Sequence, residues 1–370
     1  MKWHTLSSNE TLIMKGIAIL MIAMHNFMHL FPFPKENEFD FSFERTSSML
    51  NLLWTEPENS IRVLASFFGH FGVEVFVLLS AYGLTKKYLK HPLIYWQFIG
   101  ERIFKIFPAF IIAIVIWLAL EGFYSHGIFG PFKMLSMHYQ EILLKLTLLS
   151  NFIPDKALEP IGPWWFIPFI FQFYFVFPFL LKLHERWQET GLIALSAFCL
   201  VFTDTVEGHL YGVNLYYTIV PYIPVFALGL CLAKKDTLIS EIHIPKSFVA
   251  LALVIFILGN IYQHLWVLSN ISFILLFLVL MNIVIPKIKG SLHRLLIFTG
   301  QISMGLFLVN GFLRFPMVRW AIEKDNWLYT LVLCFVFLAI SYIMAVVVIR
   351  LERLLTSTLK ANQYKQKHSI

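Results

Sequence analysis

The feature that most constrains this chain is the recurrence of long apolar runs along nearly all of its 370 residues. A helix needs about 20 mostly apolar residues to cross a bilayer, where every backbone polar group must be satisfied within the protein. Such runs occur near residues 12–31, 63–84, 102–123, 164–183, 190–203, 214–233, 247–265, 267–285, 295–313 and 327–349. They predict an all-α, polytopic membrane bundle of about ten transmembrane helices.

Composition excludes the other broad classes. The apolar and aromatic residues make up 58% of the chain and the charged residues only 14%, whereas soluble domains carry about 25% charged residues. The three cysteines lie inside apolar runs without the spacing of a metal or redox motif. We therefore expect no metal and no nucleic-acid partner. A further apolar segment at 141–153 is too short and too charged to cross alone, and is typical of an interfacial or re-entrant helix.

The distribution of basic residues predicts the orientation. If the N-terminus is cytoplasmic, the basic clusters at 86–90, 234–235 and 286–294 and the C-terminal tail all fall on the cytoplasmic side, as the positive-inside rule requires. The first run has no small-residue cleavage site, so we expect it to remain as a span. We predict one membrane domain over residues 1–355, followed by a basic cytoplasmic tail over 356–370.

The first span holds an unusual set of polar residues. Lys15 lies near its cytoplasmic end, and His25 follows about 15 Å farther along the helix. His29 lies one turn beyond, and Asn26 stands beside His25 as a candidate for binding an acceptor. Polar groups at membrane depth are costly and are functional candidates. A histidine is largely neutral at pH 7, so it can act as a general base on a hydroxyl.

The next two spans add a carboxylate and two cations. Glu74 lies in an apolar helix and needs a partner, which could be a first-span histidine or His70 one turn away; a helix–helix bridge without chemistry is the alternative. Arg102 and Lys105 share one face at the cytoplasmic edge of the third span. They could hold an anionic donor or merely follow the positive-inside bias.

Other polar and aromatic residues allow two interpretations each. Trp164 and Trp165 could anchor a span at the interface or stack against a sugar. Gln172 and Tyr174 could line a cavity or bridge helices. The outer acidic stretch from Glu36 to Glu58 could face a cationic or neutral glycan or simply aid solubility. An external loop is expected to be a solvated surface and holds Arg314, Arg319, Glu323, Lys324 and Asp325.

Five segments, in order along most of the chain, resemble the acyltransferase 3 family, whose members are multispan membrane acyltransferases that decorate cell-surface carbohydrates. They are KGIAIL (15–20) before the embedded histidine, GVEVFVLLS (72–80), Arg102-x-x-Lys105-x-x-Pro108, WWFIP (164–168) continuing through Gln172-x-Tyr174 to Pro178, and ISMGLFL (302–308).

The resemblance implies a mechanism. A cytoplasmic acyl-CoA, usually acetyl-CoA, would give its acyl group to a hydroxyl of a surface or lipid-linked glycan, in a bacterial inner membrane. His25 is the implied catalytic residue and Lys15 is implied to act with the donor, with Glu74 and Arg102 at matching positions. The phosphates of CoA suit the cations Lys15, Arg102 and Lys105.

Three departures from the family pattern leave alternatives open. Nine residues rather than ten separate Lys15 from His25, which places them about 80° apart on a regular helix, so His29 is an alternative base. Gly83 is displaced in the second motif, and Asn310 stands where the family often has histidine. A different function class, a proton-coupled or ion-coupled transporter, would use the same buried residues as a relay.

Overall fold

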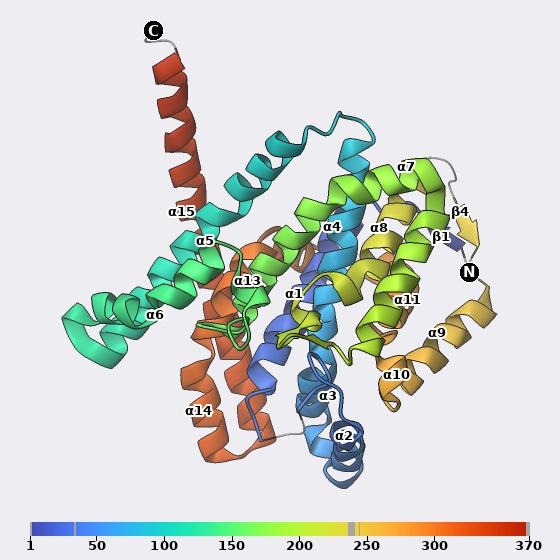
Figure 1. Ribbon diagram of the computed structural model, residues 1–370. Coiled ribbons are helices and arrows are strands. Elements are labelled where there is room, and N and C mark those ends of the chain that lie inside the picture. Colours follow the sequence, from blue (N-terminus) through green and yellow to red (C-terminus); the bar gives the residue numbers. More distant parts are fainter. Residues whose placement is uncertain (1, 33–34, 236–240, 244, 368–370) are drawn as a thin grey trace.

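The computed structural model describes residues 2–32, 35–235, 241–243 and 245–367, and these are almost entirely helical (Figure 1). The prediction of an all-α bundle is therefore confirmed. The α-helices are α1 (Ser8–Met28), α2 (Phe43–Thr55), α3 (Ser60–Phe68), α4 (Gly72–Tyr88), α5 (Tyr95–His126), α6 (Gly130–Leu146), α7 (Phe166–Thr205), α8 (Ile223–Lys235), α9 (Lys246–Gly259), α10 (Gln263–Trp266), α11 (Ser269–Val284), α12 (Gly290–Gln301), α13 (Ser303–Leu313), α14 (Phe315–Lys324) and α15 (Trp327–Lys367).

Short strands form two small antiparallel pairs. Strand β1 (Lys2–His4) pairs with β4 (Glu241–His243), with residue 3 opposite residue 242. Strand β2 (His209–Leu210) pairs with β3 (Val213–Asn214) as a tight hairpin. The first pair holds the start of the chain beside the segment that follows α8, and the second closes the connection after α7.

The number of membrane spans differs from the prediction. Among the described residues, six helical segments are long and apolar enough to cross a bilayer, or seven if α12 and α13, which meet at a 78° bend, form one broken span. The predicted count of about ten is not confirmed. Helices α8 and α9 have only 13 and 14 residues. Two of the predicted spans fall within α7, which breaks at Gln188 and turns back in Figure 1.

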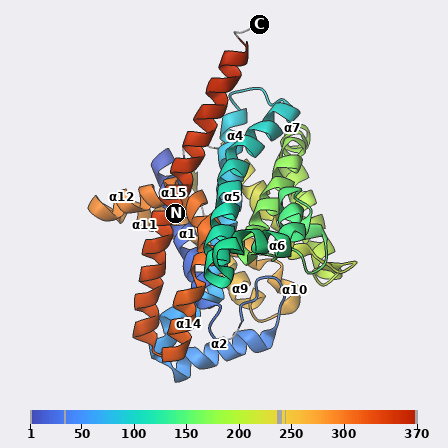
Figure 2. The same cartoon turned by 90° about the vertical axis from the view of Figure 1, so that its left-hand side faces the viewer.

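The segment expected at the membrane interface belongs to a helical hairpin. Most of residues 141–153 lie in the last turns of α6 and the short 3₁₀ helix Ser150–Phe152. Helix α6 packs back along α5, as Figures 1 and 2 both show. The contact is very close because Gly130 lies against the backbone of Gly122, where no side chain would fit. The predicted place of this segment at the membrane interface stays a prediction.

Helix α1 runs through the centre of the bundle and packs against α12, α4, α3 and α13. It begins at a capping box, in which the Ser7 hydroxyl accepts from the Glu10 N–H at 3.2 Å and the Ser7 N–H donates to the Glu10 carboxylate at 2.7 Å. About half of its residues are buried, so every polar side chain on it must find a partner inside the protein.

The two ends of the molecule carry different elements, and the predicted orientation in the membrane stays a prediction. The basic connection between α4 and α5 lies at the same end as the projecting C-terminal part of α15, whereas α2, α10 and α14 lie at the opposite end (Figure 1). We call these the inner and outer ends. The predicted division between residues 1–355 and a basic tail stays a prediction; helix α15 runs through that boundary to Lys367.

Candidate functional site

His25 is buried on α1 and its ring has a defined orientation. Its Nδ1 lies 2.7 Å from the carbonyl oxygen of Ser66, near the end of α3. Because a carbonyl only accepts, Nδ1 carries the proton and Nε2 is left with a free lone pair. The close approach depends on Gly69, since a Cβ there would lie 2.7 Å from the His25 Cβ and 2.7 Å from the Met21 carbonyl oxygen. The backbone thus fixes the tautomer that a general base requires.

Two carboxylates from the loop after α1 face this lone pair. Nε2 of His25 lies 3.6 Å from Glu38 and 3.9 Å from Glu36, and both carboxylate side chains are only 12% exposed. The loop sequence ENEFDF (36–41) alternates acidic residues with others, and its two phenylalanines were the available sign that it packs inward. The interpretation of Glu36 and Glu38 as solubilising surface residues is therefore wrong.

The two carboxyl groups differ in their tendency to ionise. Burial opposes ionisation of Glu36, but the hydrogen bond with His29 and the charge of His25 outweigh it and lower the Glu36 pKa to about 2. For Glu38, burial dominates over the contact with His25 and raises the pKa above its usual range. Glu36 is therefore an anion at neutral pH, and Glu38 is the carboxyl group that can share a proton with His25.

Arg314, at the junction of α13 and α14, completes the cluster. Its Nη1 donates to the backbone oxygen of Asn26 and lies 3.2 Å from Nε2 of His29. Burial lowers the Arg314 pKa to about 10, which leaves it a cation at neutral pH. The expectation that Arg314 belongs to a solvated loop is wrong, because it is 5% exposed and donates to the Asn26 carbonyl at the C-terminal end of α1.

His29 is consequently held between two partners. A guanidinium only donates, so Nε2 of His29 accepts from Arg314 and its Nδ1 carries the proton. That proton faces Glu36, whose oxygen is 3.4 Å away. His25, His29 and Glu36 offer potential metal ligands within 4.8 Å of one another. The Arg314 contact occupies Nε2 of His29 and leaves the ring proton on Nδ1. The cluster is therefore organised as a hydrogen-bonded network.

Glu74 and His70 lie near the cluster without joining its ion pairs. The ring of His70 lies 5.7 Å from that of His25. Both Nδ1 of His70 and Oε2 of Glu74 are buried and lack a hydrogen-bond partner among the described residues. The carboxylates that reach His25 are Glu36 and Glu38. The expected pairing of Glu74 with a first-span histidine is absent from the described ion pairs, and its catalytic role stays a prediction.

Asn26 and Asn310 join α1 to α13. The Asn26 side-chain amide donates to Oδ1 of Asn310 at 2.7 Å, and the Asn310 amide donates to the carbonyls of Leu306 and Phe307 within its own helix. Both side chains are buried. Their hydrogen bonds give Asn26 a structural role next to His25; its predicted contact with the acceptor stays a prediction.

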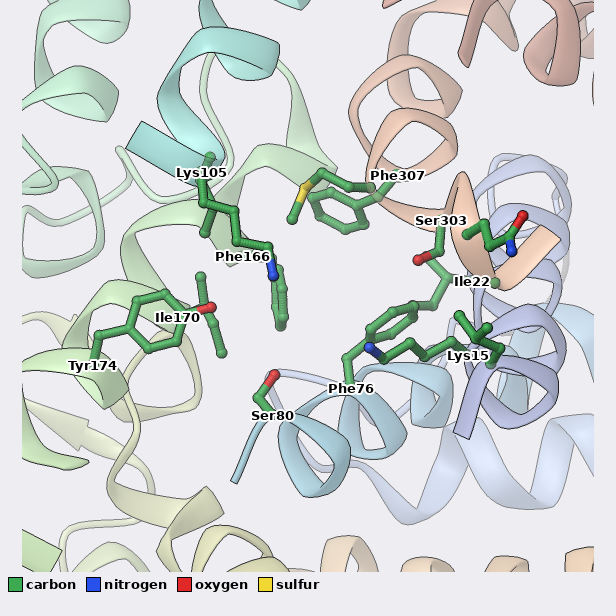
Figure 3. A pocket seen from close by; sticks show the side chains of 15 residues that line it. Lys15, Ile22, Phe76, Ser80, Lys105, Phe166, Ile170, Tyr174, Ser303 and Phe307 are labelled. Atoms are coloured by element: carbon green, nitrogen blue, oxygen red, sulfur yellow. The ribbon is translucent and has the colours of Figure 1, made fainter. Parts of the chain in front are cut away.

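A cavity of about 290 Å³, which we call the inner cavity, lies beside α1. Lys15 and Lys105 both line it, on opposite walls in Figure 3. No ion-pair partner is found for either ammonium group in the part of the chain that the structure describes. Ile22, one turn before His25 on α1, lines the same cavity. The other lining residues are Leu12, Phe76, Ser80, Ile106, Phe166, Ile170, Tyr174, Gly300, Gln301, Ser303, Met304 and Phe307.

Arg102 stands behind the inner cavity. Its guanidinium carbon lies 5.9 Å from the ring centre of Tyr174 and 5.6 Å from that of Phe98, and its Nη2 lies 3.6 Å from Glu101. Tyr174 itself lines the cavity. The structure therefore brings Lys15 and Lys105 together as expected, sets Arg102 one side chain away, and places Tyr174 beside the lysines.

The two tryptophans are packed in the interior. Trp164 is fully buried, donates its indole N–H to the carbonyl of Leu308 at 2.9 Å, and contacts Trp117 edge to face. Trp165 is also buried, and its ring lies 5.3 Å from that of Phe39 in the loop after α1. Neither ring presents a face to solvent, so the structure favours a packing role for Trp164. Trp165 contacts the loop that carries Glu38.

Comparison with known proteins identifies the family of the chain. No curated protein and no solved structure matches the chain. A family model described as an acyltransferase domain, that of acyltransferase 3, matches residues 13–346, which include α1 with its histidines, both carboxylates of the following loop and nearly all of the bundle. The chain therefore belongs to the acyltransferase 3 family of membrane acyltransferases.

Proposed function

We propose that the protein transfers an acetyl or other short acyl group from cytoplasmic acyl-CoA to a hydroxyl of a surface or lipid-linked glycan, with His25 as general base. The single observation that carries the proposal is that α1 contacts two sets of groups within one helical turn. Ile22 lines the inner cavity, which also holds the two lysines, and His25 contacts the carboxylates of the loop after α1.

The inner cavity suits the donor. Two ammonium groups, without an acidic partner among the described residues, face one partly apolar space, and a polyanion such as the diphosphate of CoA would neutralise them. Phe76, Phe166 and Phe307 provide apolar walls of the same cavity. The pantetheine arm would lie along these walls, which directs the thioester toward His25.

The chemistry follows from the tautomer of His25. Its Nε2 takes the proton from the acceptor hydroxyl while the hydroxyl oxygen attacks the thioester carbonyl. The carbon–sulfur bond then breaks, the ester is released, and the proton passes from Nε2 to the CoA thiolate. During the reaction the ring carries a positive charge, which the neighbouring Glu38 and Glu36 stabilise at 3.6 and 3.9 Å.

The structure supports His25 over His29 as the base. Nε2 of His29 accepts from the cationic Arg314, which makes protonation at that nitrogen unfavourable, and Nδ1 already bears a proton. His25 has a free lone pair, and its helix neighbour Ile22 lines the inner cavity. His29 acts instead to hold Glu36 in place.

The family membership does not favour the transporter alternative. The acceptor is proposed to be a carbohydrate or glycolipid at the outer face of a bacterial inner membrane, because the carboxylates and the loop after α1 lie toward the outer end. We expect the attacking group to be a hydroxyl, because a neutral imidazole can take its proton. A protonated amine has no lone pair with which to attack the thioester.

The test is acetyl transfer by the purified full-length protein in detergent or proteoliposomes, followed as CoA release and as transfer of radiolabel to glycan acceptors. We expect His25→Ala to reduce transfer at least about a hundredfold, the usual scale for removing a general base. The matched control is His184→Ala, which removes another buried histidine, in α7. Folding is checked by thermal denaturation. Full activity of His25→Ala, or substrate flux into proteoliposomes without CoA release, would contradict the proposal.

A further inference from the structure

A second cavity, which we call the outer pocket, opens at the outer end of the molecule. It measures about 200 Å³ and lies between the loop after α1, the end of α7, the β2–β3 hairpin and α10. The lining residues that matter here are Asp40, Asp204, Glu207, Tyr216, Gln263 and Trp266. None of them belongs to the acyl-transfer cluster described above.

One loop segment, the one after α1, contacts both His25 and the outer pocket. Glu38 contacts His25, and the next residues, Phe39 and Asp40, line the outer pocket. The Cα atoms of residues 38 and 40 are at most about 7 Å apart. Phe39 also packs against Trp165 and Tyr217, with ring centres 5.3 and 4.4 Å apart. A ligand in the outer pocket would therefore contact the same loop segment that carries Glu38.

The wall of the outer pocket has a fixed aromatic side. The rings of Tyr216 and Trp266 stack at 4.2 Å, and the Trp266 indole donates to the backbone oxygen of Asn37 at 3.1 Å. Asn214 in β3 donates to the backbone oxygen of Phe39 at 2.8 Å, which ties the hairpin to the loop. These contacts hold the pocket open between elements that are distant in sequence.

The polar side of the outer pocket is acidic. Asp40, Asp204 and Glu207 line it, and its described lining includes no lysine or arginine. Two imidazoles contact these carboxylates: Nε2 of His209, in the lining, lies 3.5 Å from Asp40, and Nδ1 of His264, beside Gln263, lies 3.1 Å from Asp204. The charges of Asp204 and Asp40 add to burial in raising the pKa of Tyr216, so its hydroxyl stays protonated. The amide of Gln263 adds both a donor and an acceptor.

From this lining we infer that the outer pocket binds an amine-bearing sugar unit of the acceptor glycan and thereby presents a hydroxyl of that glycan to His25. Carboxylates hold a protonated amine by charge-assisted hydrogen bonds, and the mixed donors and acceptors hold hydroxyl groups. The role as an acceptor site rests on the proposed function; the binding of the sugar does not.

Direct binding to the full-length protein in detergent tests the inference, by calorimetry at pH 6 with three tetrasaccharides of different charge. The probes are chitotetraose, which carries amines, neutral cellotetraose and anionic tetragalacturonate. We expect chitotetraose to bind most tightly and tetragalacturonate most weakly. The double variant Asp204→Asn/Glu207→Gln should lose about tenfold in chitotetraose affinity, the scale of a charged hydrogen bond. The control Glu44→Gln removes an exposed outer carboxylate away from the pocket and should bind as the wild type does.

The outcomes separate this inference from the proposed function. An equal affinity for the three probes, the absence of chitotetraose binding, or an unchanged affinity in the double variant overturns the inference. In acetyl-transfer assays the double variant should raise the KM for chitotetraose while kcat and the KM for acetyl-CoA stay unchanged. Binding with the expected variant dependence, but without acetyl transfer to any glycan, refutes the proposed function and leaves the outer pocket as a sugar site.

Discussion

Replacement of Gly69 by alanine should reduce acetyl transfer, although Gly69 is not proposed to contact the donor or the acceptor. Gly69 lies in the 3₁₀ turn Gly69–Phe71, where its φ of −68° is open to any residue, so the backbone is not the obstacle. The obstacle is space: the new Cβ would lie 2.7 Å from both the Met21 carbonyl oxygen and the His25 Cβ. Ordinary contact begins at 3.4 Å, so α1 must move by about 0.7 Å at His25, the proposed base.

A displacement of about 1 Å costs as much as a hundredfold in rate, so we expect a loss of about 10- to 100-fold in kcat for acetyl transfer. Overpacking should also lower the free energy of unfolding by about 1–3 kcal/mol. The matched control is Gly83→Ala, in α4, where no atom lies within 4 Å of the added Cβ. It should keep full activity and equal or greater thermal stability. The reasoning fails if Gly69→Ala retains kcat within twofold of the wild type, or if both variants lose activity equally.

Three further predictions concern charged groups. In steady-state assays, Lys15→Met and Lys105→Met should each raise the KM for acetyl-CoA about tenfold with little change in kcat. The control Lys90→Met, at an exposed position, should change neither constant. Equal effects of all three variants would refute a specific donor site. Glu38→Gln should lower kcat about 10- to 100-fold without raising the KM for acetyl-CoA, because the imidazolium formed at His25 loses its neighbouring carboxylate. An unchanged kcat would show that Glu38 does not stabilise this imidazolium. The pKa of Glu36 falls from 4.5 to about 2 on folding, so it contributes about 3 kcal/mol of stability that is fully present above pH 4.5 and is lost as the pH falls toward 2. Glu36→Gln should therefore flatten the acid limb of a plot of unfolding free energy against pH, and an unaltered acid limb would contradict this linkage.

The sequence was informative where function depends on residues within one helix. The spacing of Lys15, His25 and His29, the last of which caps α1, follows from helix geometry alone. The apolar residues between them require a membrane environment. The same reasoning overestimated the number of spans, because hydropathy measures how apolar a segment is and not whether it stays straight. Helix α7 breaks at Gln188, and α12 meets α13 at a 78° bend.

The partners of the histidines depended on tertiary structure. Glu38 and Arg314 are separated from His25 by 13 and 289 residues, and a short-range pattern cannot show that both pack against the end of α1. The sequence predicts Glu74 as a candidate partner of a histidine because it stands alone in an apolar helix, but it is in none of the described ion pairs. The loop after α1 supplies the carboxylates that contact His25.

The sequence by itself thus determined a helical membrane protein, its family and the helix that carries the candidate base. Only the tertiary structure decided which nitrogen of His25 is free, through the carbonyl of Ser66, and which carboxylates and cation surround the two histidines. The physical reason is that hydropathy and helical period are properties of consecutive residues. A hydrogen-bonding environment is instead a property of groups that meet only when distant segments pack together.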